Sequence, residues 1–300
     1  MPQLDSVRAR CVEDLRREGT VVLDRYLSPE ITAKLRGEFD AALRSLDFEM
    51  PCLAQTRLDP ERHRELIDDY LYATPAQLES VGAAFSRHEA TSIDQVVSAF
   101  EPSTLTSYML SRSSTYRGVW LDPHILAIVA HYMGLVPKLA EAYVRRNFPA
   151  RFRVMNHYWH RDLNDRHHLV KVFIFLTDTS VDNGPHEFIR GSHRDLGVLN
   201  GRRYYTDAEI DAVHPPGSPR RLVSEVPAGS VIIEDTRGLH RARNPHTGFR
   251  DLGYAVFLPL PDDTRLHCYD FPADDAAGLS AFQRAFIPRS VLRQELHSRM

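Results

Sequence analysis

The feature of this sequence that most constrains its fold is a change of hydrophobic period near residue 138. Beyond that point the chain contains short runs rich in β-branched and aromatic residues, namely KLAEAYV, RFRVMNHYW, VKVFIFL, SVIIED and DLGYAVFL. Turn residues separate these runs, as at Asn183-Gly184 and Pro215-Pro216-Gly217. Several short strands joined by such turns are typical of a jelly-roll or barrel. We therefore expect a β core over about residues 138–260.

The first part of the chain, about residues 1–137, has a helical period instead. One helix is expected over residues 5–18, and a second begins at Ser28 with Pro29 at its first position. A short strand over residues 20–23 separates them. These helices are expected to pack on the outside of the β core.

The end of the chain, residues 261–300, is polar and is expected to form a helical tail with a helix over residues 279–296. No internal repeat, low-complexity tract or long linker divides the chain. The prediction is a single domain over residues 1–300. It belongs to the α+β class, with N- and C-terminal helices flanking a mainly β core.

Charge and composition exclude several classes of protein. The formal net charge is −3, so nothing attracts the chain as a whole to nucleic acid or to an anionic membrane. No apolar run reaches the roughly 18–20 residues of a membrane span, and the N-terminus lacks a signal-peptide core. The cysteines Cys11, Cys52 and Cys268 are far apart, as in a reduced cytoplasmic protein. We expect a cytoplasmic protein without nucleic-acid or membrane partners. Its oligomeric state is not indicated.

The run from Val154 to Asp162 contains the most informative polar residues. In a strand, residues two apart share a face. One face is therefore expected to carry Asn156, Tyr158, His160 and Asp162. His160 and Asp162 could then bind one metal ion, although a lone HxD pair arises by chance in many proteins. Asn156 and Tyr158 could equally satisfy each other inside the barrel.

A third candidate metal ligand, His240, follows the run SVIIED. Two imidazoles and one carboxylate can occupy three corners of an octahedron and leave three positions open. Such a site suits a non-haem Fe(II) oxygenase, which must hold a bidentate co-substrate and O2 together. Taken by itself, His240 could also be a surface-loop histidine.

Arg250 is a candidate anion-binding residue. It opens a predicted strand and shares its parity with Leu252 and Tyr254, so its side chain is expected to point inward. A buried guanidinium requires an anion, and its planar fork matches a carboxylate. The alternative is a surface ion pair with Asp251 or Glu234.

These residues lie in stretches that resemble the phytanoyl-CoA dioxygenase family of Fe(II)- and 2-oxoglutarate-dependent oxygenases. The resemblance spans roughly residues 11–258, through REGTVVLDRYLSPE, HYWHRDLND, VKVFIFLTDTSVDNGPHEFIRGSHR and VPAGSVIIEDTRGLHRARNPHTGFR. It implies a core of the double-stranded β-helix type (jelly-roll or cupin-like). It also implies three cofactors and co-substrates: Fe(II), 2-oxoglutarate and O2.

The resemblance further implies a role for each candidate residue. Fe(II) is bound by two histidines and one carboxylate, namely His160, Asp162 and His240. Arg250 binds 2-oxoglutarate, and Asn156 and Tyr158 are further candidate contacts of 2-oxoglutarate or substrate. The usual outcome in this family is hydroxylation of an unactivated C–H bond.

Other polar residues are expected to have structural roles. Lys171 is expected to extend its ammonium to solvent from a strand end. Loops are expected to hold five other histidines, namely His167, His168, His186, His193 and His246. The sequence also departs from the family where Ala242 replaces a hydroxyl-bearing residue.

The function expected from these observations is hydroxylation, or a related oxidation, of a small molecule. A natural-product intermediate is favoured, and a lipid-derived acyl substrate is the second choice. Two alternatives stay open: a jelly-roll binding protein without turnover, and a cupin-type oxygenase that does not use 2-oxoglutarate. Motifs of zincins, α/β-hydrolases, P-loop proteins and Rossmann proteins are missing from the sequence.

Overall fold

The computed structural model describes residues 1–48, 50–51, 72–73, 92–100, 102–149, 155–162, 169–195, 204–264 and 269–292. The α-helices are α1 (Ser6–Glu18), α2 (Pro29–Arg44), α5 (Ile93–Phe100), α6 (Ser114–Trp120), α7 (Pro123–Met133), α8 (Asp207–Val213), α9 (Ala273–Ala277), α10 (Ala281–Arg284) and α11 (Arg289–Leu292). Three 3-10 helices are η2 (Met109–Ser111), η3 (Met155–His157) and η4 (Ser192–Arg194). The strands are β1 (Thr20–Leu23), β2 (Met50–Pro51), β3 (Tyr72–Ala73), β4 (Thr104–Ser107), β5 (Lys138–Asn147), β6 (Trp159–His160), β7 (Val170–Phe175), β8 (His186–Ile189), β9 (Tyr204–Tyr205), β10 (Arg221–Val223), β11 (Val231–Asp235), β12 (His240–Ala242) and β13 (Arg250–Leu258).

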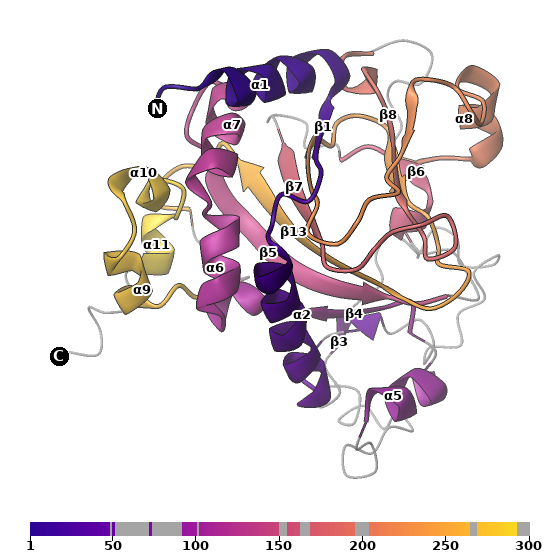
Figure 1. The fold of residues 1–300 in the computed structure, drawn as a ribbon, viewed down its shortest axis with the longest axis horizontal. Coiled ribbons are helices and arrows are strands. Elements are labelled where there is room, and N and C mark those ends of the chain that lie inside the picture. The colour runs from indigo at the N-terminus through magenta and orange to yellow at the C-terminus, as the bar shows by residue number, and fades with distance from the viewer. Residues whose placement is uncertain are drawn as a thin grey trace.

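The core consists of two antiparallel sheets (Figure 1). The six-stranded sheet has the order β1-β11-β7-β13-β5-β4, and the five-stranded sheet has the order β10-β8-β12-β6-β9. From β6 to β13 the chain passes repeatedly from one sheet to the other. This arrangement confirms the jelly-roll-like core expected from the short period-two runs.

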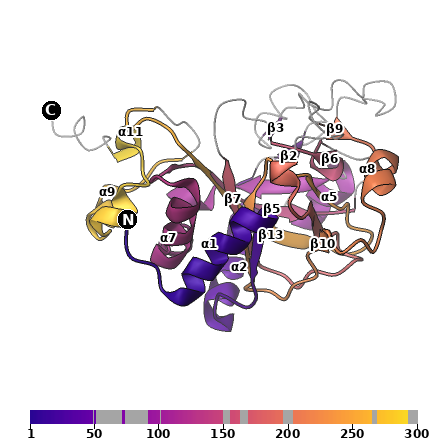
Figure 2. The ribbon, with the colours of Figure 1, turned by 90° about the horizontal axis from the view of Figure 1, so that it is seen from above.

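Helices cover the outer face of the six-stranded sheet (Figures 1 and 2). Leu15 of α1, Leu35 of α2 and Leu126 of α7 are fully buried in one apolar cluster with Val172 and Ile174 of β7. Alternation along β7 explains this packing, because residues two apart share a face. The helices therefore hold the sheet from outside and leave its other face to the interior.

The inner face of the same sheet carries a smaller apolar cluster and the polar residues of interest. Phe173 and Phe175 of β7 pack with Ile232 of β11 and Leu252 of β13. Lys171 has the same parity on β7 as these two phenylalanines, so the inner face becomes charged at the start of the strand. A polar site is thus built at one end of the space between the sheets.

Capping residues set the boundaries of the first two helices. Asp5 caps α1 by accepting a hydrogen bond from the Arg8 amide, and Gly19 ends the helix with φ +82°. Ser28 caps α2, and Pro29 occupies its first turn. The expected helix over residues 5–18 and the strand over residues 20–23 are confirmed.

Three expectations about secondary structure are wrong. Most of the described part of RFRVMNHYW is the 3-10 helix η3, and β6 has two residues because β12 and β9 supply ladder partners only there. The larger sheet does not begin at residue 138 as expected, since β1, at the expected strand over residues 20–23, and β4 form its edges. Over residues 269–292 the C-terminal tail contains three short helices, and Pro288 interrupts the expected long one. Residues 293–300 lie outside the described ranges.

The structure also bears on the expectations about membrane spans and cysteines. Within the described ranges, no helix combines the length and the apolar character needed to cross a bilayer. Cys11 is a buried free thiol. Cys52 and Cys268 lie outside the described residues.

Candidate functional site

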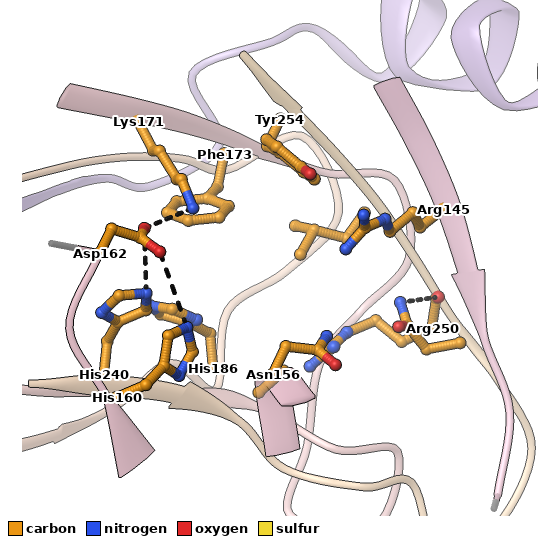
Figure 3. Close-up of a pocket in the computed structure, with 13 residues that line it drawn as sticks. Arg145, Asn156, His160, Asp162, Lys171, Phe173, His186, His240, Arg250 and Tyr254 are labelled. Carbon is orange, nitrogen blue, oxygen red and sulfur yellow. Dashed lines mark hydrogen bonds and ion pairs between the residues drawn. The ribbon is translucent and has the colours of Figure 1, made fainter. Parts of the chain in front are cut away.

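Three polar side chains converge between the two sheets, at the end of β6 and β12 (Figure 3). His160 of β6 and His240 of β12 are directly paired in the antiparallel register, so both rings project to the same side. Asp162 follows β6 by two residues. Its Oδ2 lies 3.6 Å from His240 Nε2, and its Oδ1 lies 4.0 Å from His160 Nε2. One ligand atom from each of the three residues lies within 4.8 Å of the others.

Backbone hydrogen bonds orient the two imidazoles. Nδ1 of His160 lies 2.8 Å from the carbonyl oxygen of Tyr158, and Nδ1 of His240 lies 2.9 Å from that of Gly238. A carbonyl oxygen only accepts, so each Nδ1 carries the proton and donates it. The Nε2 lone pairs are therefore left to face Asp162, in the tautomer that binds a metal ion.

Burial of the two histidines and the charge of Lys171 beside Asp162 keep this donor set unprotonated at neutral pH. Burial lowers the pKa of His160 to about 4 and that of His240 well below the ordinary range. Burial by itself would raise the pKa of Asp162, but the Lys171 ammonium, followed by the two histidines, lowers it below its usual value. Two neutral imidazoles and one ionised carboxylate result, and this set fits a divalent cation of the first transition series.

Lys171 contacts this carboxylate directly, so its expected extension to solvent is wrong. Its Nζ lies 2.5 Å from Asp162 Oδ2, and its side chain is 18% exposed. Burial would lower the pKa of Lys171, but the Asp162 carboxylate raises it. The lysine points inward because it has the parity of Phe173, and the ion pair offsets the cost of burying it.

The three residues form one end of a cavity of about 120 Å³. At about 10–15 Å³ for each water-sized group, this volume can hold a small dicarboxylate. Its walls come from both sheets, and they comprise Arg145, Asn147, Asn156, His160, Asp162, Lys171, Phe173, His186, His240, Ala242, Arg250, Leu252 and Tyr254. The cavity is thus polar at the triad, apolar in the middle and cationic at the far side.

Arg250 lies on the far side, opposite the triad (Figure 3). It is 1% exposed, so the alternative of a surface ion pair is wrong. Among the described residues, no group accepts a hydrogen bond from its Nε or Nη1. Burial without a counter-ion lowers the pKa of Arg250 to about 10. A buried fork of donors facing a cavity is a binding site for a carboxylate.

The structure separates the other two candidate residues. Asn156 lines the cavity beside Arg250, whereas Tyr158 is not among the lining residues. The expected common face depended on a strand through both residues, and η3 replaces that strand at Asn156.

Sequence reasoning missed several residues of the cavity wall, among them His186 and Arg145. His186 lies in β8 rather than in a loop, and its Nε2 is 2.7 Å from Oε2 of the buried Glu234. Arg145 lies in β5, opposite Leu252 of β13. Alternation along β5 places Arg145 on one face of the strand, but only the pairing of β5 with β13 shows that this face lines the cavity. His167 and His168 lie outside the described residues.

Two arginines near His240 do not reach the cavity. Arg241 Nε lies 2.8 Å from Glu187 Oε2, and Arg243 Nε lies 3.5 Å from Glu187 Oε1. Glu187 alternates with the inward-facing His186 on β8, so these pairs lie on the opposite face of the five-stranded sheet. These ion pairs stabilise the five-stranded sheet. Arg250, unlike Arg241 and Arg243, lines the cavity that contains the triad.

Comparisons with known proteins agree with this architecture. The model of the phytanoyl-CoA dioxygenase (PhyH) family matches residues 15–251. No curated protein sequence matches the chain.

Several solved structures have a similar fold. The epimerase SnoN, in complex with Fe3+, α-ketoglutarate and nogalamycin RO, has a TM-score of 0.55 at 16% identity, over 84% of each chain. The non-haem α-ketoglutarate-dependent carbocyclase SnoK from nogalamycin biosynthesis has a TM-score of 0.54 at 18% identity, over 85% of this chain and 84% of that one. HygX from Streptomyces hygroscopicus, with nickel, 2-oxoglutarate and hygromycin B bound, has a TM-score of 0.51 at 18% identity, over 88% of this chain and 96% of that one. At these identities the likeness concerns the fold.

Proposed function

The chain belongs to the phytanoyl-CoA dioxygenase family, and from that premise we propose that it is a non-haem Fe(II)- and 2-oxoglutarate-dependent dioxygenase acting on a small molecule. His160, Asp162 and His240 hold the metal, and Arg250 binds the distal carboxylate of 2-oxoglutarate. The observation that carries the proposal is the placement of both parts in one cavity. An unprotonated donor triad forms one end, and a buried guanidinium without an acceptor among the described residues faces it.

The donor set supports a metal with open positions. Two imidazoles and a carboxylate on one side of an ion form the facial arrangement of non-haem Fe(II) oxygenases. SnoN and HygX have been solved with a metal and with α-ketoglutarate or 2-oxoglutarate bound, which supports the same pair of ligands here. When bound, Fe(II) with 2-oxoglutarate and O2 supplies the oxidising power for an unactivated C–H bond.

The chain's own residues have three tasks in this proposal. The carbonyl oxygens of Tyr158 and Gly238 fix the imidazole tautomers, and Lys171 holds the Asp162 carboxylate in place. Phe173 lines the middle of the cavity and restricts water there. Arg250, with Asn156 beside it, sets the distance from the metal at which a dicarboxylate is anchored.

The reaction proposed is hydroxylation, or another oxidation that begins at a C–H bond, of a natural-product intermediate. The structural neighbours support oxidative tailoring of such compounds, because they include an epimerase, a carbocyclase and a protein solved with hygromycin B. They also carry out different final steps, so the outcome depends on how the substrate is placed against the metal.

We also infer that the core is a double-stranded β-helix and that residues 1–300 form one domain. The repeated passage of the chain between the two sheets from β6 to β13 supports the first inference. The apolar cluster that joins residues of α1, α2, α7 and the C-terminal helices to the larger sheet supports the second.

The test combines metal binding with turnover of 2-oxoglutarate. His160→Ala and His240→Ala are each expected to abolish binding of Fe(II) and formation of succinate, and omission of 2-oxoglutarate is expected to abolish oxidation. His246→Ala is the matched control, because His246 is exposed and lies outside the cavity. Metal binding and succinate formation at the wild-type level in either triad variant would remove the ligand assignment. Oxidation without 2-oxoglutarate would favour a cupin-type oxygenase.

A further inference from the structure

Lys171 has a defined position at the metal end of the cavity. It lies in β7, an inner strand that pairs with both β11 and β13, so its backbone is held on both sides. Its Nζ lies 5.6 Å from the ring centroid of Tyr254 and 2.5 Å from Asp162 Oδ2. A cation–π contact and an ion pair therefore act on the same ammonium and hold it beside the triad (Figure 3).

The pairing of Lys171 with Asp162 depends on the contacts of a second carboxylate, that of Glu234. In the register of β7 with β11, Glu234 lies directly opposite Lys171, on the same face of the sheet. Its Oε2 lies 2.7 Å from His186 Nε2, and its Oε1 accepts a hydrogen bond from Thr20 Oγ1 at 3.2 Å. Both oxygens of Glu234 are thus engaged, and the ammonium of Lys171 pairs with Asp162 instead.

The two oxygens of Asp162 consequently have different surroundings. Oδ2 has the Lys171 ammonium at 2.5 Å and His240 Nε2 at 3.6 Å, whereas Oδ1 lies 4.0 Å from His160 Nε2. An ammonium at this distance occupies lone-pair positions of the oxygen that it contacts, so Oδ2 has less electron density to give to a metal ion. Oδ1 is therefore the better metal ligand of the two.

The number of carboxylate oxygens on a metal ion decides how many of its positions stay open. With two imidazoles in an octahedron, a carboxylate bound through one oxygen leaves three positions, and a carboxylate bound through both oxygens leaves two. A chelating 2-oxoglutarate fills two positions. Only a carboxylate bound through one oxygen therefore keeps a position for O2.

We propose that Lys171 keeps Asp162 a one-oxygen ligand of the metal and thereby preserves the third open position. The inference rests on the proposed function and adds a positioning residue to it, because Lys171 acts through Asp162. The ion pair holds Oδ2 on the side of β7, so the carboxylate is not free to turn both oxygens towards the metal.

The test counts the water ligands of bound Mn(II), from the relaxation rate of water protons, on the full chain and without turnover. The count is made before and after saturation with 2-oxoglutarate. Lys171→Met is the main variant, because methionine keeps the apolar stem and removes the ammonium. Lys34→Met is the matched control, since Lys34 is exposed on α2 and lies outside the cavity.

The wild type and Lys34→Met are expected to have about three water ligands on Mn(II), and about one after saturation with 2-oxoglutarate. Lys171→Met is expected to have about two, and almost none after saturation. The contribution of bound water to the relaxation rate thus falls by about a third before 2-oxoglutarate and almost completely after it.

A merely structural role of Lys171 gives a different result. Neutralising a buried carboxylate affects the stability of the protein, but it leaves the number of water ligands on Mn(II) unchanged. Equal water counts in Lys171→Met and the wild type, with and without 2-oxoglutarate, therefore overturn the inference.

If Lys171→Met does not fold, Lys171→Gln decides by the same criteria, because its amide is uncharged and one atom shorter than the lysine side chain. The failure of the proposed function looks different. In that case the wild type and Lys34→Met do not bind Mn(II), or 2-oxoglutarate displaces no water from their Mn(II). The count made without 2-oxoglutarate still tests Lys171 wherever Mn(II) binds.

Discussion

Replacing Arg250 by methionine is expected to stabilise the ligand-free protein and to remove the stabilisation that 2-oxoglutarate gives the wild type. The side chain is buried, its Nε and Nη1 have no acceptor among the described residues, and burial lowers its pKa from its ordinary value to about 10. At about 1.4 kcal/mol for each factor of ten in proton affinity, the buried charge costs about 3 kcal/mol. Methionine keeps most of the apolar stem and removes this charge.

The ligand-free Arg250→Met variant is therefore expected to be more stable than the wild type, by about 1–3 kcal/mol. For a chain of this length this corresponds to a rise in Tm of about 2 °C per kcal/mol. With Mn(II) and 2-oxoglutarate at about a hundred times its Kd, the wild type gains about 2.7 kcal/mol. The variant is expected to gain almost nothing from 2-oxoglutarate, because it has lost the carboxylate-binding fork.

Arg146→Met is the matched control on the other face of the same strand pair. Arg146 donates to Asp251 through Nε at 2.8 Å and Nη2 at 2.7 Å, and to Asp40 at 2.6 Å. Its removal leaves the fully buried Asp251 without its cation, which costs about 3–5 kcal/mol. Thermal unfolding followed by circular dichroism compares the two variants. A ligand-free Arg250→Met protein that melts several degrees below the wild type would refute the reasoning, since Arg250 would then have a structural partner.

Two further predictions follow from the contacts of buried residues. Lys171→Met is expected to lower the unfolding free energy of the metal-free protein by about 3–5 kcal/mol, because Asp162 loses its counter-charge. In thermal melts, Mn(II) should restore part of the lost stability. A loss of stability that Mn(II) leaves unchanged contradicts the role given to Asp162. Burial lowers the pKa of His193. Below about pH 6.5 the His193 imidazole therefore binds a proton more readily in the unfolded state than in the native state, and the stability of the protein falls with falling pH. His193→Gln should reduce that slope by up to about 1.4 kcal/mol per pH unit in denaturant titrations between pH 7 and 5, and an identical slope in both proteins would exclude the contribution.

His160, Asp162 and Arg250 could be proposed as site residues from the sequence because their pattern is local. His160 and Asp162 are two positions apart, and Arg250 lies at the start of a long alternating strand whose parity sets the direction of its side chain. The capping residues of α1 and α2 are local in the same sense. The roles of Lys171 and His186 could not be read in this way. Their partners, Asp162 and Glu234, are set by pairing between strands and between the two sheets.

The class of the fold, the helix boundaries near the N-terminus and the candidate residues for metal and carboxylate binding could be inferred from the sequence alone. These follow from hydrophobic period, capping chemistry and side-chain parity, which act over a few neighbouring residues. Three other features became evident from the folded chain: His160 and His240 are direct neighbours, η3 interrupts the expected strand, and Arg145 lies on the strand next to that of Arg250. Strand register brings together residues about a hundred positions apart. It depends on how two whole sheets bury their apolar faces against each other and against the helices, so no short stretch of sequence contains it.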